Sequence, residues 1–112
     1  MKLAVGCWTG CMLVLLGVSS LQAQEIDRGR GLYETNCVGC HDTSVHRREV
    51  RVARDVAALR EQVERWGRNT GARLRPDEVD AVTVYLNGLY YNHPCPSALC
   101  PPTRAGLDRG GR

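Results

Sequence analysis

Apolar residues recur at helical spacing in three segments of the 112-residue chain. The clearest is residues 55–66, where the charged residues fall between the apolar positions and so predict a solvent-exposed face. Steps of three, four and three separate the members of the predicted buried stripe, which are Val56, Leu59, Val63 and Trp66. Gly67 follows, where a helix is expected to end.

The segments before and after it also predict helices. Residues 25–37 place Ile26, Gly29, Leu32–Tyr33 and Asn36–Cys37 on one face. Gly29 and Gly31 each weaken a helix by ~1 kcal/mol relative to alanine, so close approach of another helix is the expected reason for them. In residues 75–92, Pro76 suits the first helical position and two acidic residues suit the first turn. The predicted buried stripe there is Val79, Val82, Tyr85–Leu86 and Leu89.

No segment alternates as a strand would, so we expect a small all-α domain of about three main helices joined by irregular loops. We assign this domain to residues 24–92. Four prolines and several glycines make residues 93–112 a tail that cannot continue a long helix. In this tail Cys95 and Cys100 are candidates for a small disulfide loop, and residues after Pro102 are expected to be disordered.

The N-terminal segment predicts a signal peptide over residues 1–23. Lys2 precedes an uncharged apolar stretch from Leu3 to Val18, and Ala23 offers a small residue at a cleavage site. An uncleaved N-terminal anchor is the alternative, and only then is a membrane partner expected. Export favours a periplasmic location and cysteines that are oxidised, metal-bound or covalently used.

Cleavage after residue 23 would also remove Lys2, the only lysine of the chain. The remaining chain has 14 arginines against 12 acidic residues, a net charge of +2. Because a nucleic-acid-binding protein is expected to carry a strongly basic face, this near balance argues against nucleic acid as a partner.

Cys37, Cys40 and His41 form a Cys-x-x-Cys-His motif, which is typical of covalent haem attachment. One tight turn brings the two sulfurs within reach of the haem vinyl groups, and the histidine that follows is carried under the iron as its proximal ligand. Gly39 has no Cβ to collide with the porphyrin. We therefore expect one covalently bound haem c.

Two other interpretations of the motif are weaker. A zinc site would need further ligands at short spacing, and Cys95 and Cys100 are distant and wrongly spaced. A thioredoxin-like redox pair would follow a strand, and no strand-like pattern precedes Cys37.

Further positions extend the motif on both sides: Gly29 and Tyr33 precede Cys37, Cys40 and His41, and Val82, Tyr85 and Leu86 follow near the end. In these positions, residues 26–91 resemble the monohaem class I cytochromes c. The resemblance implies that the first and last helices cross, with Gly29 packed against Tyr85. It also implies one-electron transfer between redox protein partners.

The chain departs from this family at the second axial ligand, which is usually a methionine in the loop before the last helix. The corresponding residues 67–75 hold none, and the only methionines are Met1 and Met12. Candidates for the distal position are His93, His46 and Asn69. His93 and an open or weakly held site carry equal weight; His46 is less favoured and is expected to bond to backbone or a haem propionate instead.

The distal ligand decides the function. Two strong ligands favour an electron carrier, and an open position favours binding of a diatomic gas or small anion. No acid–base constellation suggests catalysis, so we do not expect an enzyme. We expect a periplasmic electron carrier, with a gas- or anion-binding haem protein as the alternative.

Overall fold

The computed structural model describes residues 18–100, with side chains from Ala23 onward. Its three α-helices are α1 (Val18–Asn36), α2 (Val56–Asn69) and α3 (Pro76–Leu86). A 3₁₀ turn, η1 (Thr43–Arg47), lies between α1 and α2, and a π-helical turn, η2 (Asn87–Tyr91), extends α3. No strand occurs within residues 18–100, which confirms the expectation of an all-α fold.

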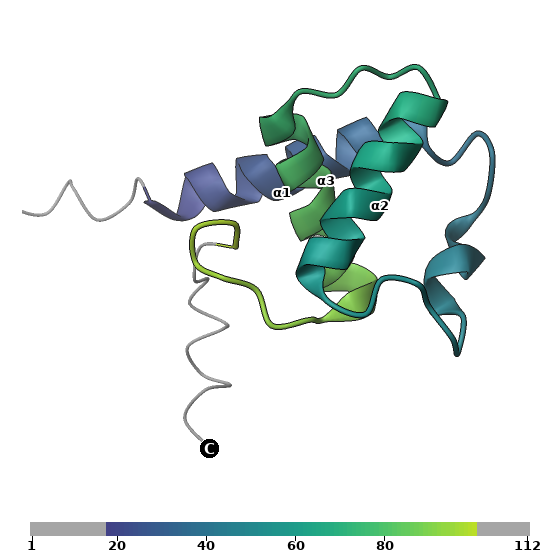
Figure 1. Ribbon diagram of the computed structural model, residues 1–112. Coiled ribbons are helices and arrows are strands. Elements are labelled where there is room, and N and C mark those ends of the chain that lie inside the picture. Colours follow the sequence, from purple (N-terminus) through teal and green to yellow (C-terminus); the bar gives the residue numbers. More distant parts are fainter. Residues whose placement is uncertain (1–17, 101–112) are drawn as a thin grey trace, which may run out of the picture.

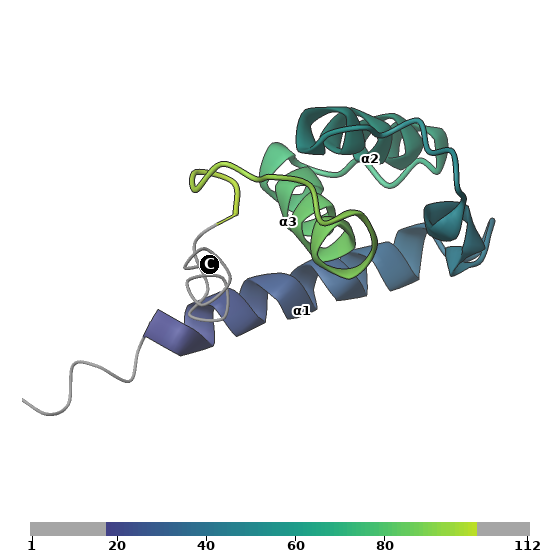
Figure 2. The ribbon, with the colours of Figure 1, turned by 90° about the horizontal axis from the view of Figure 1, so that it is seen from below.

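The third helix organises the domain. It packs across α1 on one side and against α2 on the other (Figures 1 and 2). Buried side chains from all three helices meet there, principally Tyr33, Leu59, Val63, Val79, Val82 and Leu86. The chain between α1 and α2 loops out to one side of this core (Figure 1).

Gly29 is the point of closest approach between α1 and α3. A Cβ at this position would overlap the carbonyl oxygen of Ala81 and would lie 3.0 Å from the Cβ of Tyr85. The contact of Gly29 with Tyr85 that the sequence implies is therefore present. Gly31 has no such role in helix packing, because a Cβ there would meet nothing within 4 Å.

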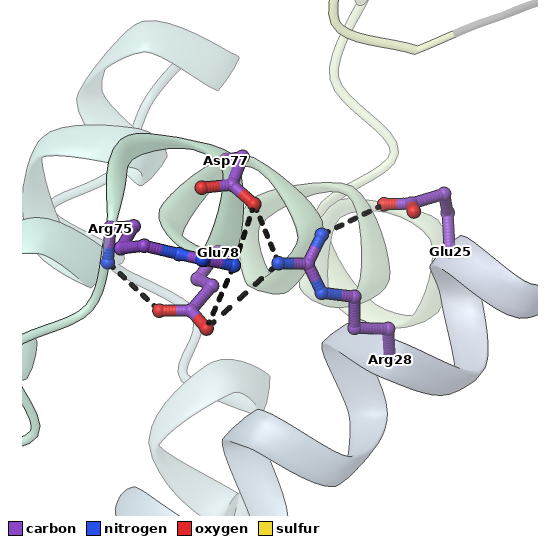
Figure 3. Close-up of polar contacts among 5 residues, drawn as sticks. All are labelled: Glu25, Arg28, Arg75, Asp77 and Glu78. Atoms are coloured by element: carbon purple, nitrogen blue, oxygen red, sulfur yellow. Dashed lines mark hydrogen bonds and ion pairs between the residues drawn. The ribbon is translucent and has the colours of Figure 1, made fainter.

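Ion pairs at the start of α3 hold the same two helices together. Figure 3 shows Arg28 of α1 reaching across to Asp77, with a nitrogen–oxygen distance of 2.6 Å, and lying 3.8 Å from Glu78. The hydrogen bond from Arg28 lowers the pKa of Asp77. Glu78 in turn accepts a hydrogen bond from the backbone N–H of Arg75, which caps the first turn of α3. Pro76 stands at the start of the helix, as predicted.

Two members of the predicted buried stripes are exposed. Trp66 on α2 is 51% exposed to solvent, and Leu89 is 54% exposed. Leu89 is exposed because the chain widens into the π turn after Leu86, so the spacing that aligns it with Val82 is lost. The other apolar members of the α2 and α3 stripes are buried, except Tyr85, which is partly buried.

Two helix boundaries also differ from the predictions. The first helix begins at Val18, well before Ile26. The second does not end at Gly67 but continues to Asn69, and Gly67 is buried because Leu74 folds back onto it. A Cβ at Gly67 would lie 3.2 Å from a methyl carbon of Leu74, so this glycine permits close packing. The turn itself uses Gly71, whose φ is +74°.

Beyond η2 the chain turns at Asn92, and Cys95 and Cys100 form a disulfide with their Cα atoms 5.7 Å apart. Most of the predicted signal peptide, residues 1–17, lies outside the described residues. The disorder expected after Pro102 falls outside them as well.

Candidate functional site

The Cys-x-x-Cys-His motif lies at the end of α1, where the helix gives way to a tight turn. The backbone N–H of Cys37 still donates to Tyr33 at 2.9 Å, and that of Cys40 donates to the Cys37 carbonyl at 3.4 Å. Both cysteines are thiols; Cys37 is partly buried, which raises its pKa, and Cys40 is exposed. Because the two cysteines and His41 are close in the chain, this turn brings all three to one place.

All three residues line a cavity of about 500 Å³, which falls within the range of roughly 300–1,000 Å³ typical of cofactor and small-molecule sites. The loop from Cys37 to Ala53 forms one wall and α2 forms another. The remaining apolar lining comes from α1 and from α3, through Tyr33, Val82 and Leu86. The exposed stripe residue Trp66 lies on this cavity, together with the exposed Val50 and Val52.

The ring of His41 is oriented by its own neighbour. Its Nδ1 lies 2.9 Å from the backbone carbonyl oxygen of Asp42, a bond that Nδ1–H donates. With the proton on Nδ1, Nε2 carries the lone pair that binds a metal. Asp42 is fixed in turn, because its carboxylate accepts a hydrogen bond of 2.8 Å from the backbone N–H of Ser44 at the start of η1.

His46 is buried within a cluster of tyrosines. Its Nε2 lies 2.7 Å from the hydroxyl of Tyr33, its Nδ1 lies 2.9 Å from that of Tyr91, and its ring stacks on Tyr90 with 5.1 Å between centroids. A neutral imidazole donates from one nitrogen and accepts at the other, so it satisfies both phenols. Burial, with the nearby charges of His41 and Arg51, lowers the pKa of His46 to about 4.

This cluster differs from the backbone or propionate bond expected of His46. The partners are side chains from α1 and η2, which are 13 and 45 residues away in the chain. The sequence contains no local signal for such a pairing. Although His46 lines the cavity, both of its nitrogens are already hydrogen-bonded.

His93 is held outside the cavity lining. Its Nε2–H donates a hydrogen bond of 2.9 Å to the carbonyl oxygen of Ala53, so Nε2 carries the proton. Its backbone N–H and carbonyl are both bonded to the side-chain amide of Asn87, at 2.9 and 3.1 Å. The third distal candidate, Asn69, does line the cavity, at the end of α2.

The charged residues on the cavity are all arginines: Arg48, Arg51 and Arg65. No aspartate or glutamate lines it, and none of the three has a carboxylate partner within 4.0 Å among residues 18–100. Arg51 is fixed by the carbonyl oxygens of Tyr90 and His46, at 2.7 and 3.2 Å. Arg47 lies outside the lining, over the ring of Tyr90. The cavity therefore suits an apolar molecule that carries negative charge.

Comparison with known protein families, curated proteins and solved structures finds no match to this chain. In the part of the chain that the structure describes, no three His, Cys, Asp or Glu residues gather as a metal site. A haem iron does not require such a group, because the porphyrin supplies four of its ligands. None of the helices in residues 18–100 is both long and apolar enough to cross a membrane.

Proposed function

We propose that this protein is a monohaem c-type cytochrome that carries single electrons between redox protein partners. The observation that supports this most is the meeting of Cys37, Cys40 and His41 on one apolar cavity. Two thiols and an imidazole with its Nδ1 already engaged are the donor set that covalent haem needs. The residues present thus fit the group.

The charge of the cavity supports the same proposal independently of the motif. A haem is a flat apolar molecule with two carboxylates, and the cavity pairs an apolar lining with three arginines that lack carboxylate partners. Arg48 and Arg51 follow η1 and both line the cavity. One Nη of Arg51 donates to the carbonyl oxygens of His46 and Tyr90, so its other N–H groups would be the ones to bind an anion. No carboxylate lines the cavity, so the net charge of its lining is positive.

Each residue then has a role in the carrier. Cys37 and Cys40 would anchor the haem through thioether bonds and His41 would bind its iron, while the carbonyl of Asp42 holds the imidazole orientation. The haem supplies the one-electron couple of its iron.

The predicted signal peptide supports export to the periplasm, where haem is attached to such motifs and where redox protein donors and acceptors would be met. Neither nucleic acid nor catalysis forms part of the proposal. Attachment to a membrane is expected only if the N-terminal segment is uncleaved.

The decisive experiment compares the two cysteine pairs. We would express the full chain with haem-maturation machinery, denature it, and measure the haem that remains on the polypeptide by mass and by absorption. Cys37→Ala with Cys40→Ala should abolish covalent haem. The matched control, Cys95→Ala with Cys100→Ala, should retain it, because that pair forms a disulfide away from the cavity. Haem on the first double variant would refute the proposal.

The hydrogen bonds of the histidines favour a second candidate, a haem protein with an open distal site. His46 is bonded through both ring nitrogens and His93 is bound to Ala53, so either would have to break its contacts to reach the iron. The absorption spectrum with and without carbon monoxide separates the candidates: a carrier with two strong ligands should not respond.

A further inference from the structure

The wall that α2 contributes to the cavity carries three polar side chains at helical spacing. Gln62, Arg65 and Asn69 all line the cavity, and they lie three and four residues apart. Side chains at such steps share one side of a helix. We call these three residues the polar face of α2. It belongs to a different wall from the loop that carries His41.

Arg65 differs from the other arginines of α2 in its partners. Arg60 pairs with Asp80 at 2.6 Å and Arg68 pairs with Glu64 at 2.9 Å, so the charges of both are compensated. Arg65 has no carboxylate within 4.0 Å among the described residues. It donates instead to the side-chain oxygen of Gln62 at 2.8 Å and lies 5.4 Å from the centroid of the Trp66 ring.

These contacts orient hydrogen-bond donors, and Arg65, which is exposed to solvent, has no carboxylate partner among the described residues. The oxygen of Gln62 is taken by Arg65, so its NH₂ group is the part that remains to bind another molecule. Arg65 offers only donors, and one of them is used. Together with the amide of Asn69, the polar face of α2 is complementary to a small acceptor that carries negative charge.

No histidine with a free ring nitrogen other than His41 lines the cavity. Of the residues lining the cavity, only His41 and His46 are histidines, and His46 is hydrogen-bonded at both nitrogens. The loop after α2 contributes only Thr70 to the lining. We propose, building on the proposed haem attachment and on the open-site candidate in particular, that the polar face of α2 binds a small inorganic anion that would also contact the haem iron, with Arg65 supplying the charge.

The test uses the ferric holoprotein and azide as the probe. Covalent haem is first measured on the denatured sample. Azide is then titrated while the absorption spectrum is recorded, and a saturable shift is expected. Arg65→Leu should weaken azide binding by about ten-fold or more, the effect expected for one charge-assisted hydrogen bond. Arg68→Leu is the matched control: it removes the same charge from the same helix but from a residue outside the cavity, and should leave affinity unchanged.

The outcomes separate this proposal from the one on which it rests. Covalent haem with no response to azide overturns the anion site and leaves the cytochrome proposal standing; absence of covalent haem overturns both. The anion site is also overturned if the two arginine variants bind azide with equal affinity. It is overturned as well if the reduced protein binds carbon monoxide but the oxidised protein does not respond to azide. If Arg65→Leu does not accumulate as holoprotein, Gln62→Leu replaces it and must weaken azide binding several-fold for the proposal to stand.

Discussion

Replacing Gly29 and Gly31 by alanine, one at a time, should change the stability of the domain in opposite directions. Both residues lie in α1, two positions apart, and both substitutions improve helix propensity by ~1 kcal/mol. Their surroundings differ: a methyl group at Gly31 would meet nothing within 4 Å, whereas at Gly29 it would overlap the backbone of Ala81. Backbone atoms of a packed helix cannot move aside as a flexible side chain would.

The overlap should force α1 and α3 apart, at a cost near the upper end of the roughly 1–3 kcal/mol typical of overpacked cores. After the gain in propensity, Gly29→Ala should lose about 2 kcal/mol, and Gly31→Ala should gain up to about 1 kcal/mol. For a domain of this size, we expect Tm to fall by roughly 8–16 °C in the first variant and to rise by a few degrees in the second. Thermal unfolding followed by far-ultraviolet circular dichroism measures both. Equal Tm values for the two variants would refute the close contact between α1 and α3.

Further predictions concern His46 and the start of α2. Because the pKa of His46 falls from 6.5 to about 4 on folding, its contribution to stability should be fully present above pH 6.5 and decline by up to about 3 kcal/mol as the pH falls towards 4; unfolding across this range should show a larger decline in wild type than in His46→Gln, which retains only the shared contribution of the carboxylates. Tyr33→Phe leaves Nε2 of His46 without its phenol and should cost about 1–3 kcal/mol in urea unfolding, whereas Tyr85→Phe, whose hydroxyl bonds to no other described residue, should cost less. Asp55→Ala removes the 2.7 Å bond to the N–H of Ala58 and should lower stability by ~1 kcal/mol; an unchanged urea midpoint would argue against that cap.

Local patterns predicted the helices but not their surroundings. The second and third helices were predicted because apolar spacing and Pro76 act within a few residues of where they stand. The same spacing placed Trp66 in the core, since periodicity identifies a face of a helix and not what covers it. Gly67 illustrates a related ambiguity: a glycine signals either a helix end or close packing, and only the return of Leu74 decides between them.

In the candidate site, too, local contacts could be predicted from the sequence and tertiary contacts could not. Cys37, Cys40 and His41 meet because one turn joins them, so their proximity follows from the sequence. The partners of His46 and His93 come from elements that tertiary packing brings together, and no spacing rule reaches them. Sequence analysis therefore could not choose among His93, His46 and Asn69, whereas the fold distinguishes the two histidines by their hydrogen bonds.

The composition of the chain gives a physical reason for a cavity of this size. The sequence has no phenylalanine and only two tryptophans, and one of those, Trp66, lies on the cavity with half its surface exposed. Val50 and Val52 are nearly four-fifths exposed on the same cavity. Burial of such side chains contributes to stability only when another apolar surface covers them. A bound haem would provide that surface, so that the group which carries the electron would also complete the core.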